Sequence, residues 1–350
     1  MKKKLVSILL VSVLTASVIF TGCKKSTDNE SNNKETTAET KDTEETKAAE
    51  ETKKPAKKTD IVIGTGGTAG TYYVVAAAMA STINNHSDLL NVIAQPSKGS
   101  VENINLTNTG DIQMGFSNAD GVYFAANGTN MYEKTGVQNI AGVMSLYMSA
   151  GQIATMKDSG IETYGDLKGK KVCLGPPSTT ITEMSKTILM EYGIDPEKDI
   201  TPYYLSFDEG LQKLTDGEID ASFFVAGVPT AAMISATSTG NVTLVDVDEK
   251  IIEKITSEKS YYIPYKIPAG TYKGTDKDIN TFKIMTEIFV NKDLPEDVVY
   301  EFVKQALENV EEYRGSHIVC DEINPVTASF TSAELHPGAA KYFKEIGIIN

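Results

Sequence analysis

The chain repeats one order of segments, and this order constrains the fold more than any other feature of the sequence. A strand-like apolar segment, a turn at 64–70 and a helix-like segment are followed by Gly110-Asp111-Ile112 and a further apolar segment. The same order recurs with a turn at 175–180 and with Gly217-Glu218-Ile219. Strands that alternate with helices indicate an α/β protein with largely parallel sheets, and the repeat predicts two lobes of one plan.

Each lobe is expected to contain its strands and helices in the same sequence. In the first lobe we expect strands at 61–63, 90–94 and 112–116 and helices at 71–83 and 100–108. In the second lobe we expect strands at 171–174 and 219–223, a helix from Thr180 to Met190 or Tyr192 that starts with a Thr180–Glu183 capping box, and a helix at 211–214 after a Ser206–Glu209 capping box.

Two apolar segments, 150–157 and 282–290, are expected to be strands that cross between the lobes. We therefore predict that lobe 1 consists of 59–149 with 281–350, and that lobe 2 consists of 150–280. Ligands in open α/β sheets bind beyond the carboxyl ends of the strands. Two mixed or parallel sheets that are joined by hinge strands would therefore leave an interlobe cleft.

The N-terminus predicts export and membrane attachment. Lysines at 2–4 precede an uncharged apolar stretch at 5–20, and Gly22 lies just before Cys23. The stretch is short for a transmembrane anchor, and the pattern resembles a bacterial lipoprotein signal at 1–23 in which Cys23 is acylated. Residues 24–58 have almost no large apolar side chains, which predicts a disordered stalk. We expect a lipid-anchored protein on the extracytoplasmic face of the cell membrane.

Composition excludes several classes of partner. The net charge of −14 and the pI of about 4.8 argue against nucleic acid. No histidine has a Cys or His at metal-ligand spacing, so we expect no metal, and no motif calls for a cofactor. Cys173 and Cys320 could pair, but the apolar surroundings of Cys173 favour buried free thiols. Arg314 is the only arginine, so a carboxylate ligand would be held by backbone N–H groups, hydroxyls or a lysine.

The strand ends supply the candidate ligand-binding residues. Gly66, Gly67 and Thr68 would offer N–H groups and a hydroxyl where the first helix begins. Tyr72 could close over a ligand or belong to the helix core, Ser100 could bind or act as an N-cap, and Asp120 could accept from a ligand amino group or start a helix. The candidates of the first lobe are Gly66, Gly67, Thr68, Tyr72, Ser100, Asn103, Ser117, Asn118 and Asp120, with Lys98 as a possible cation or a solvated surface lysine.

The second lobe is expected to face these residues with a similar set. Thr180 is foremost a helix cap in this interpretation, which leaves Ser178 and Thr179 as the better ligand donors, and Gly227 would allow close backbone approach. The candidates here are Ser178, Thr179, Thr180, Phe224, Ala226 and Gly227.

Two enzyme-like interpretations are weaker. Gly64 and Gly66 begin a dinucleotide fingerprint, but its third position is Ala69 and the strand at 90–94 ends at Gln95 rather than an acid. The segment 115–119 is close to a nucleophile elbow with Ser117 at its centre and His317 or His336 downstream, but Ala119 stands where glycine is required.

Five motifs in order resemble the TAXI family of solute receptors for tripartite ATP-independent periplasmic (TRAP) transporters. They are Gly64–Tyr73, Gly99–Asn103, Phe223–Pro229, Ile267–Tyr272 and Leu335–Ala339. The resemblance implies a type II periplasmic-binding-protein fold, no catalysis, and delivery of a small organic acid or amino acid, such as glutamate or 2-oxoglutarate, to a TRAP permease. A binding protein for an ABC importer is the alternative, and we expect a monomer. Where the family often has Gly-Pro-Pro-Gly-Ser-Gly, this chain has hydroxyl-bearing residues at 178–180, which puts ligand identity in question.

Overall fold

The computed structural model describes residues 58–177 and 179–350. The predictions for the signal at 1–23, for Cys23, for most of the stalk and for Ser178 lie outside the described residues. Within the described ranges, no helix has both the length and the apolar character needed to cross a membrane.

The first repeat is a three-stranded parallel unit, in which β1 lies between β2 and β3. Its elements are β1 (Thr59–Gly64), α1 (Thr71–His86), β2 (Leu90–Gln95), α2 (Ser100–Thr109), β3 (Met114–Asn118) and the following helix α3 (Ala119–Asn127). Each expected strand and helix is present. The third strand begins and ends two residues later than predicted.

The second repeat has the same topology, with β5 between β6 and β7 in parallel pairing. Its elements are β5 (Lys171–Cys173), α4 (Thr180–Glu191), β6 (Thr201–Tyr203), α5 (Phe207–Thr215) and β7 (Ala221–Ala226). The structure therefore confirms the repeated order of strands and helices, and the Ser206–Glu209 capping box at α5 is present. The predicted cap of α4 is wrong: Thr179, not Thr180, accepts from the N–H of Thr182.

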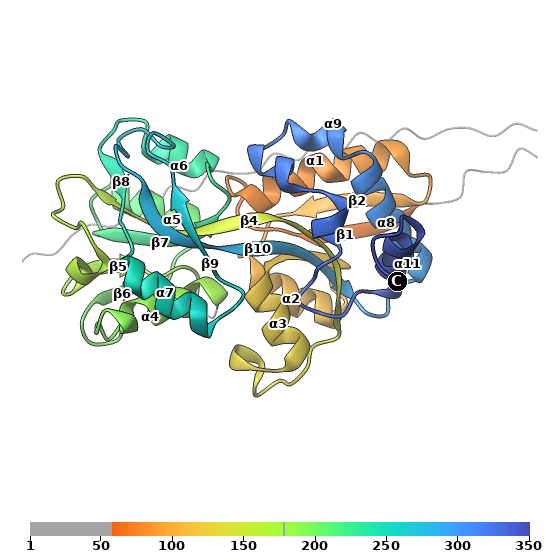
Figure 1. The fold of residues 1–350 in the computed structure, drawn as a ribbon, viewed down its shortest axis with the longest axis horizontal. Coiled ribbons are helices and arrows are strands. Elements are labelled where there is room, and N and C mark those ends of the chain that lie inside the picture. Colours follow the sequence, from red (N-terminus) through yellow and green to blue (C-terminus); the bar gives the residue numbers. More distant parts are fainter. Residues whose placement is uncertain (1–57, 178) are drawn as a thin grey trace, which may run out of the picture. The chain divides into compact units, whose positions relative to one another are not determined.

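Two long strands connect the repeats (Figure 1). β4 (Ile140–Met156) pairs with β7, β10 (Ile279–Asn291) pairs with β3, and β4 and β10 pair with each other, all antiparallel. The described strands thus form one hydrogen-bonded sheet where we expected two, although the expected α/β class is confirmed. β4 begins ten residues earlier than predicted, because the whole of its first half is buried and apolar. The predicted lobe boundaries fall within these two strands.

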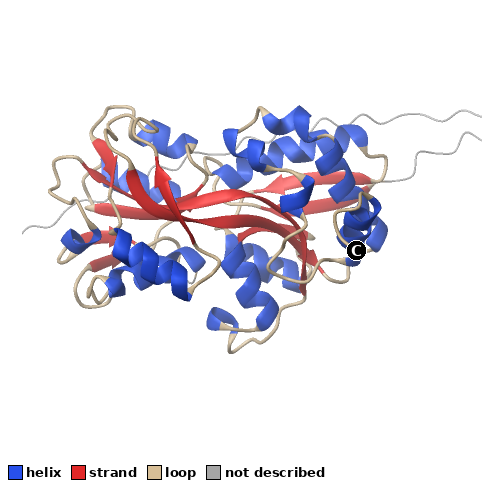
Figure 2. Cartoon of the chain, in the orientation of Figure 1, coloured by secondary structure: helices blue, strands red, loops and turns tan. Residues whose placement is uncertain are grey.

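Helices cover both faces of the sheet, and the chain's C-terminal part completes the first core (Figure 2). Buried Phe302 and Phe343 pack in one cluster with Ile61 and Met79, whereas Phe223 and Phe282 belong to a second cluster. The remaining elements are η1 (Asn130–Tyr132), η2 (Tyr164–Leu167), α6 (Ala231–Ala236), β8 (Val242–Leu244), α7 (Glu249–Glu258), β9 (Ile263–Ile267), α8 (Glu296–Glu308), α9 (Val310–Arg314), η3 (Ile318–Glu322), α10 (Pro325–Ala328) and α11 (Pro337–Glu345).

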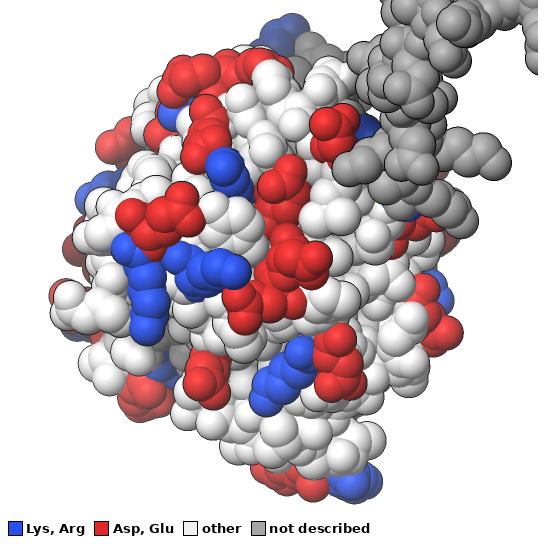
Figure 3. All heavy atoms as spheres, turned by 90° about the vertical axis from the view of Figure 1, so that its right-hand side faces the viewer, with Lys and Arg blue, Asp and Glu red and all other residues white. Residues whose placement is uncertain are grey.

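The surface charge is mixed. On the face in Figure 3, acidic and basic side chains are interspersed, without a continuous basic area. This distribution suits a protein with an excess of acidic residues and offers no footprint for a nucleic-acid backbone on that face.

Candidate ligand-binding site

A cavity of about 120 Å³ lies between the turns of the two repeats. Both repeats contribute the residues that follow the carboxyl ends of their parallel strands, which is where ligands of open α/β sheets bind. The lining residues are Gly66, Gly67, Gly70, Thr71, Tyr72, Ser97, Lys98, Gly99 and Ser100 of the first repeat and Gly175, Pro176, Ile181, Ser206, Phe207, Asp208, Phe223, Phe224, Val225 and Ala226 of the second.

The structure brings six of the predicted site residues together in this lining and leaves eight outside it. Those in the lining are Gly66, Gly67, Tyr72, Ser100, Phe224 and Ala226. Those outside it are Thr68, Asn103, Ser117, Asn118, Asp120, Thr179, Thr180 and Gly227. Thr68 is exposed, and Gly227 lies behind the cavity wall, where a Cβ atom would come within 2.9 Å of the Thr71 side chain.

The helices of the two repeats differ at the ends that meet the cavity. The N-caps of α1 and α2 are Gly70 and Gly99, which have no side chain to bond the first turn, and Gly99 has a φ of 100° that favours glycine. Among the described residues, none accepts a hydrogen bond from the N–H of Thr71 or Ser100. In the second repeat, Thr179 caps α4 and Ser206 caps α5. Each of these caps bonds one first-turn N–H, that of Thr182 or Glu209, and α1 and α2 lack such a bond, which leaves more of their first-turn donors open to an anion.

Thr71 is a lining residue that the sequence did not single out. Its Oγ1 is buried and has no hydrogen-bond partner among the described residues. A buried hydroxyl without a partner is unfavourable, so a ligand atom that paired with it would be stabilised. Its position directly after the glycine-rich turn is the feature of the sequence that could have identified Thr71 as a lining residue.

One charged side chain of each sign lines the cavity. Lys98 lies between β2 and α2, and Asp208 lies in the first turn of α5. Asp208 faces the glycine-rich turn across the cavity, because a Cβ atom on Gly67 would lie 2.9 Å from Asp208 Oδ2. Desolvation by the surrounding residues, and then the neighbouring Glu209, raise the pKa of Asp208. The repeat itself could have revealed Asp208, since α5 is the counterpart of α2.

A hydrogen-bonded layer supports the cavity wall of the first repeat. The hydroxyl of Tyr72 donates to Asn118 Oδ1 at 2.6 Å, and the N–H of Asn118 donates to Ser100 Oγ at 3.2 Å. Asn103 Nδ2 donates to the carbonyls of Thr65 and Phe116 at 2.7 and 2.8 Å, which ties β1 to β3. Asn103 and Asn118 therefore hold the wall, and burial raises the pKa of Tyr72.

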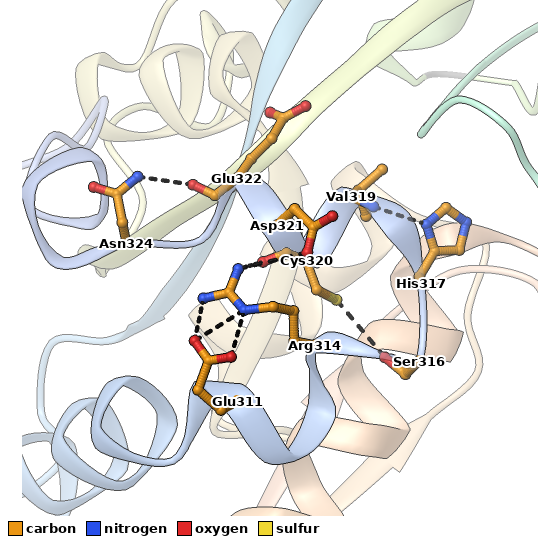
Figure 4. Close-up of polar contacts among 9 residues, drawn as sticks. All are labelled: Glu311, Arg314, Ser316, His317, Val319, Cys320, Asp321, Glu322 and Asn324. Carbon is orange, nitrogen blue, oxygen red and sulfur yellow. Dashed lines mark hydrogen bonds and ion pairs between the residues drawn. The ribbon is translucent and has the colours of Figure 1, made fainter.

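The serine hydrolase interpretation receives no support from the geometry. Ser117 Oγ donates to the carbonyl of its neighbour Asn118 at 2.8 Å. His317 Nδ1 accepts from the N–H of Val319 (Figure 4). His336 Nδ1 accepts from the N–H of Gly338, so each ring caps a helix. Burial lowers the pKa of both histidines. No hydrogen bond joins Ser117 to either ring.

Arg314 is engaged away from the cavity. Its Nε and Nη2 donate to the carboxylate of Glu311 at 3.0 and 2.8 Å, and its Nη1 donates to the carbonyl of Cys320 at 3.1 Å (Figure 4). Cys320 and Cys173 are both buried free thiols, which excludes the alternative of a disulfide between them. Within residues 58–177 and 179–350, no group of three or more His, Cys, Asp or Glu is arranged to hold a metal ion.

Two buried carboxyl groups lie beside the hinge strands. Asp120, in the first turn of α3, accepts from the hydroxyl of Tyr262 at 3.1 Å and from the N–H of Gly121 at 2.7 Å. Glu287 on β10 accepts from the N–H and the hydroxyl of Ser332 at 3.0 and 2.7 Å. Burial raises the pKa of Asp120 to about 6 and that of Glu287 to about 7. The Asp120–Tyr262 bond joins segments that the prediction assigned to different lobes.

Comparison with known proteins identifies the family. A family model described as the NMT1-like family matches residues 63–347. The chain belongs to the NMT1-like family.

Solved structures similar to this NMT1-like chain include solute-binding proteins. The alkanesulfonate-binding protein SsuA from Xanthomonas axonopodis pv. citri, bound to MOPS, is 15% identical, with a TM-score of 0.49 and coverage of 83% of this chain and 85% of that chain. The periplasmic aliphatic sulphonate binding protein SsuA from Escherichia coli is 16% identical, with a TM-score of 0.43 and coverage of 81% and 82%. A structure from work on glutathione import via GshT of Streptococcus mutans is 14% identical, with a TM-score of 0.46 and coverage of 76% and 95%.

The role of Asn103 can be tested by stability. The Asn103→Ala variant loses two buried amide donors and leaves the carbonyl of Phe116 without this partner, so the free energy of unfolding should fall by about 2 to 3 kcal/mol. Urea titration followed by circular dichroism measures this change. Asn105→Ala, on the exposed side of the same helix, is the matched control and should change stability by less than about 0.5 kcal/mol. Equal effects of the two variants would contradict the assigned role.

The pH dependence of stability tests the state of Asp120. Because its pKa rises from 3.8 to about 6 on folding, the native state binds more protons than the unfolded state in this interval, and stability falls as pH rises. One pKa unit corresponds to about 1.4 kcal/mol, so the contribution of Asp120 amounts to up to about 3 kcal/mol by pH 7. Asp120→Asn should remove this part of the decrease in the free energy of unfolding with pH. Urea unfolding between pH 4 and pH 7.5 measures the slope of that decrease. Asp111→Asn, an exposed control, should keep the wild-type slope. An Asp120→Asn slope equal to that of wild type would refute this assignment.

Proposed function

We propose that this protein is an extracytoplasmic solute-binding protein that captures a small organic anion or amino acid between its two repeats, without catalysis. The observation that carries the proposal is the cavity itself. One side has N–H groups without partners, Thr71 and Lys98, and the other side has the aromatic residues Phe207 and Phe224. This combination of polar donors and an apolar wall is typical of small-molecule sites.

The long strands β4 and β10 suggest how ligand binding would change the conformation that a partner protein recognises. β4 and β10 run without interruption from one repeat to the other, so a bend in them would open or close the cavity. A ligand that contacts both repeats stabilises the closed arrangement by its extra affinity for that arrangement. The two repeats approach each other closely at Gly67 and Asp208 and at Gly227 and Thr71, where a built Cβ atom would come within 2.9 Å of the facing side chain, and this closeness supports a closed arrangement. In this proposal the lobes are 59–149 with 281–350, and 150–280.

The finer assignment follows the TAXI resemblance. The closed protein would deliver its ligand, of the glutamate or 2-oxoglutarate class, to a TRAP permease, as a monomer with the type II periplasmic-binding-protein arrangement. Acylated Cys23 would hold it on the outer face of the cell membrane, and residues 24–58 would act as a spacer. Membership of the NMT1-like family is compatible with delivery to an ABC importer as well, so this partner is the second candidate.

Substitution of Thr71 tests the site. Thr71→Val removes a hydroxyl that has no partner among the described residues, so it should leave stability nearly unchanged while it weakens ligand binding about tenfold. Isothermal titration calorimetry of the full-length protein against a panel of carboxylates, amino acids and sulfonates measures the affinity. Thr68→Val is the matched control, because Thr68 is exposed and outside the cavity. Binding that is insensitive to Thr71→Val but lost in Thr68→Val would place the ligand elsewhere.

The transport partner can be identified directly. Crosslinking of the full-length protein in its own membranes, with and without ligand, followed by affinity purification should recover a TRAP-type permease. Ligand should increase the yield, because the closed surface is the form that the permease would recognise. Recovery of an ABC permease with its ATPase would instead support the second candidate.

A further inference from the structure

The charged side chains of the cavity are complementary to a ligand that carries both signs. Neither the Lys98 ammonium nor the Asp208 carboxylate forms an ion pair or side-chain hydrogen bond with any described residue, including each other. Glu209, the acid nearest in sequence to Asp208, accepts from the N–H and hydroxyl of Ser206, and the charge of Lys98 also acts on its carboxylate, although the two form no ion pair. Both side chains are exposed at the edge of the cavity, so an opposite charge on a ligand would replace water as the partner of each.

The two charges belong to opposite sides of the cavity. Lys98 lies on the side of the uncapped helices α1 and α2, whose N–H groups also attract an anion. Thr71, whose buried Oγ1 has no partner among the described residues, lies on this side too. Asp208 belongs to the second repeat and faces Gly67. A carboxylate at the first repeat would therefore place a neighbouring ammonium within reach of Asp208.

Apart from Asp208 and Ser206, whose hydroxyl donates to Glu209, the side chains that line the cavity from the second repeat are apolar. Phe207 and Phe224 stack with their ring centroids 4.3 Å apart, and Ile181 and Phe223 extend the same wall. The cavity volume of about 120 Å³ is far below the 300 to 1,000 Å³ that is usual for drug-sized ligands. The small volume favours a ligand with few heavy atoms.

We propose that the ligand is a small α-amino acid zwitterion with an uncharged side chain, whose carboxylate binds at the N-termini of α1 and α2 beside Lys98 and whose ammonium binds Asp208. This inference rests on the proposed function and narrows its ligand class. A dicarboxylate would bring a second negative charge to Asp208 or to the aromatic wall, and no further cation lines the cavity to receive it. The geometry thus departs from the glutamate or 2-oxoglutarate class that the family resemblance implies.

Pairs of amino acids and 2-oxo acids isolate the role of the ammonium, because each pair differs only in that group. We suggest calorimetric titration of the full-length protein with L-alanine and pyruvate, L-valine and 2-oxoisovalerate, and L-glutamate and 2-oxoglutarate. The chain contains no tryptophan, so heat is a better signal than intrinsic tryptophan fluorescence. Alanine or valine should bind at least tenfold more tightly than its oxo acid and than either dicarboxylate.

Two variants test the roles of the Asp208 and Lys98 charges separately. Asp208→Asn should weaken the amino acid at least tenfold and leave pyruvate unchanged or bound more tightly, since a repulsive charge is removed. Lys98→Gln should weaken the amino acid and the oxo acid alike. Asp216→Asn on the same helix and Lys134→Gln on the other repeat are exposed controls outside the cavity and should change neither affinity. Thermal unfolding of each variant verifies that it is folded.

The outcomes separate this inference from the proposed function. Tighter binding of 2-oxo acids or dicarboxylates, or an amino acid affinity that Asp208→Asn leaves within twofold of wild type, overturns the inference and leaves the solute-binding role intact. If the full panel, including sulfonates, gives no binding that depends on Thr71 or Lys98, the proposed function fails and the inference fails with it.

Discussion

The antiparallel pairing of β4 with β10 is the contact on which the rest of the structure depends. Each strand is long enough to bond its partner in the middle and to bond one repeat at an end, β3 for β10 and β7 for β4. This pairing sets the two parallel units in one sheet and brings the turns at their strand ends toward each other. Without this pairing, nothing would position the glycine-rich turn of the first repeat and the N-terminus of α5 at the same cavity.

The two repeats share a topology but not a chemistry at that space. Glycine N-caps leave the first turns of α1 and α2 without a side-chain bond, whereas Thr179 and Ser206 each bond one first-turn N–H of α4 and α5. Backbone donors without partners, together with the dipole of each helix, make the first repeat the half that attracts an anion. The second repeat supplies aromatic surface and the Asp208 carboxylate instead, so the asymmetry of the caps orients whatever ligand is bound.

Much of the fold could be predicted, because the turns at 64–70 and 175–180 each mark a strand that leads into a helix. β4 was only half predicted, since residues 140–147 are all buried and lack the alternation that marks a half-exposed strand. In the site, Gly66, Tyr72 and Phe224 could be predicted because they lie at or near the carboxyl ends of strands. Asp208 and Thr71 were not singled out, although the repeat and the glycine-rich turn mark their positions, because the bonding state of their side chains depends on contacts between distant segments. Thr179 and Thr180 were confused because Glu183 stands three residues after Thr180, as a capping box requires, while Thr179 makes the actual bonds.

The bonds made by Asn103, Asn118 and Ser100 have a consequence for selectivity. These side chains hold the wall of the first repeat rigid within the protein itself, so its shape does not await a ligand. A preorganised wall loses little conformational entropy when a ligand binds. It also has little freedom to rearrange around a molecule with an extra branch. Discrimination between closely related solutes would therefore come from the fixed shape of the wall, largely through steric exclusion.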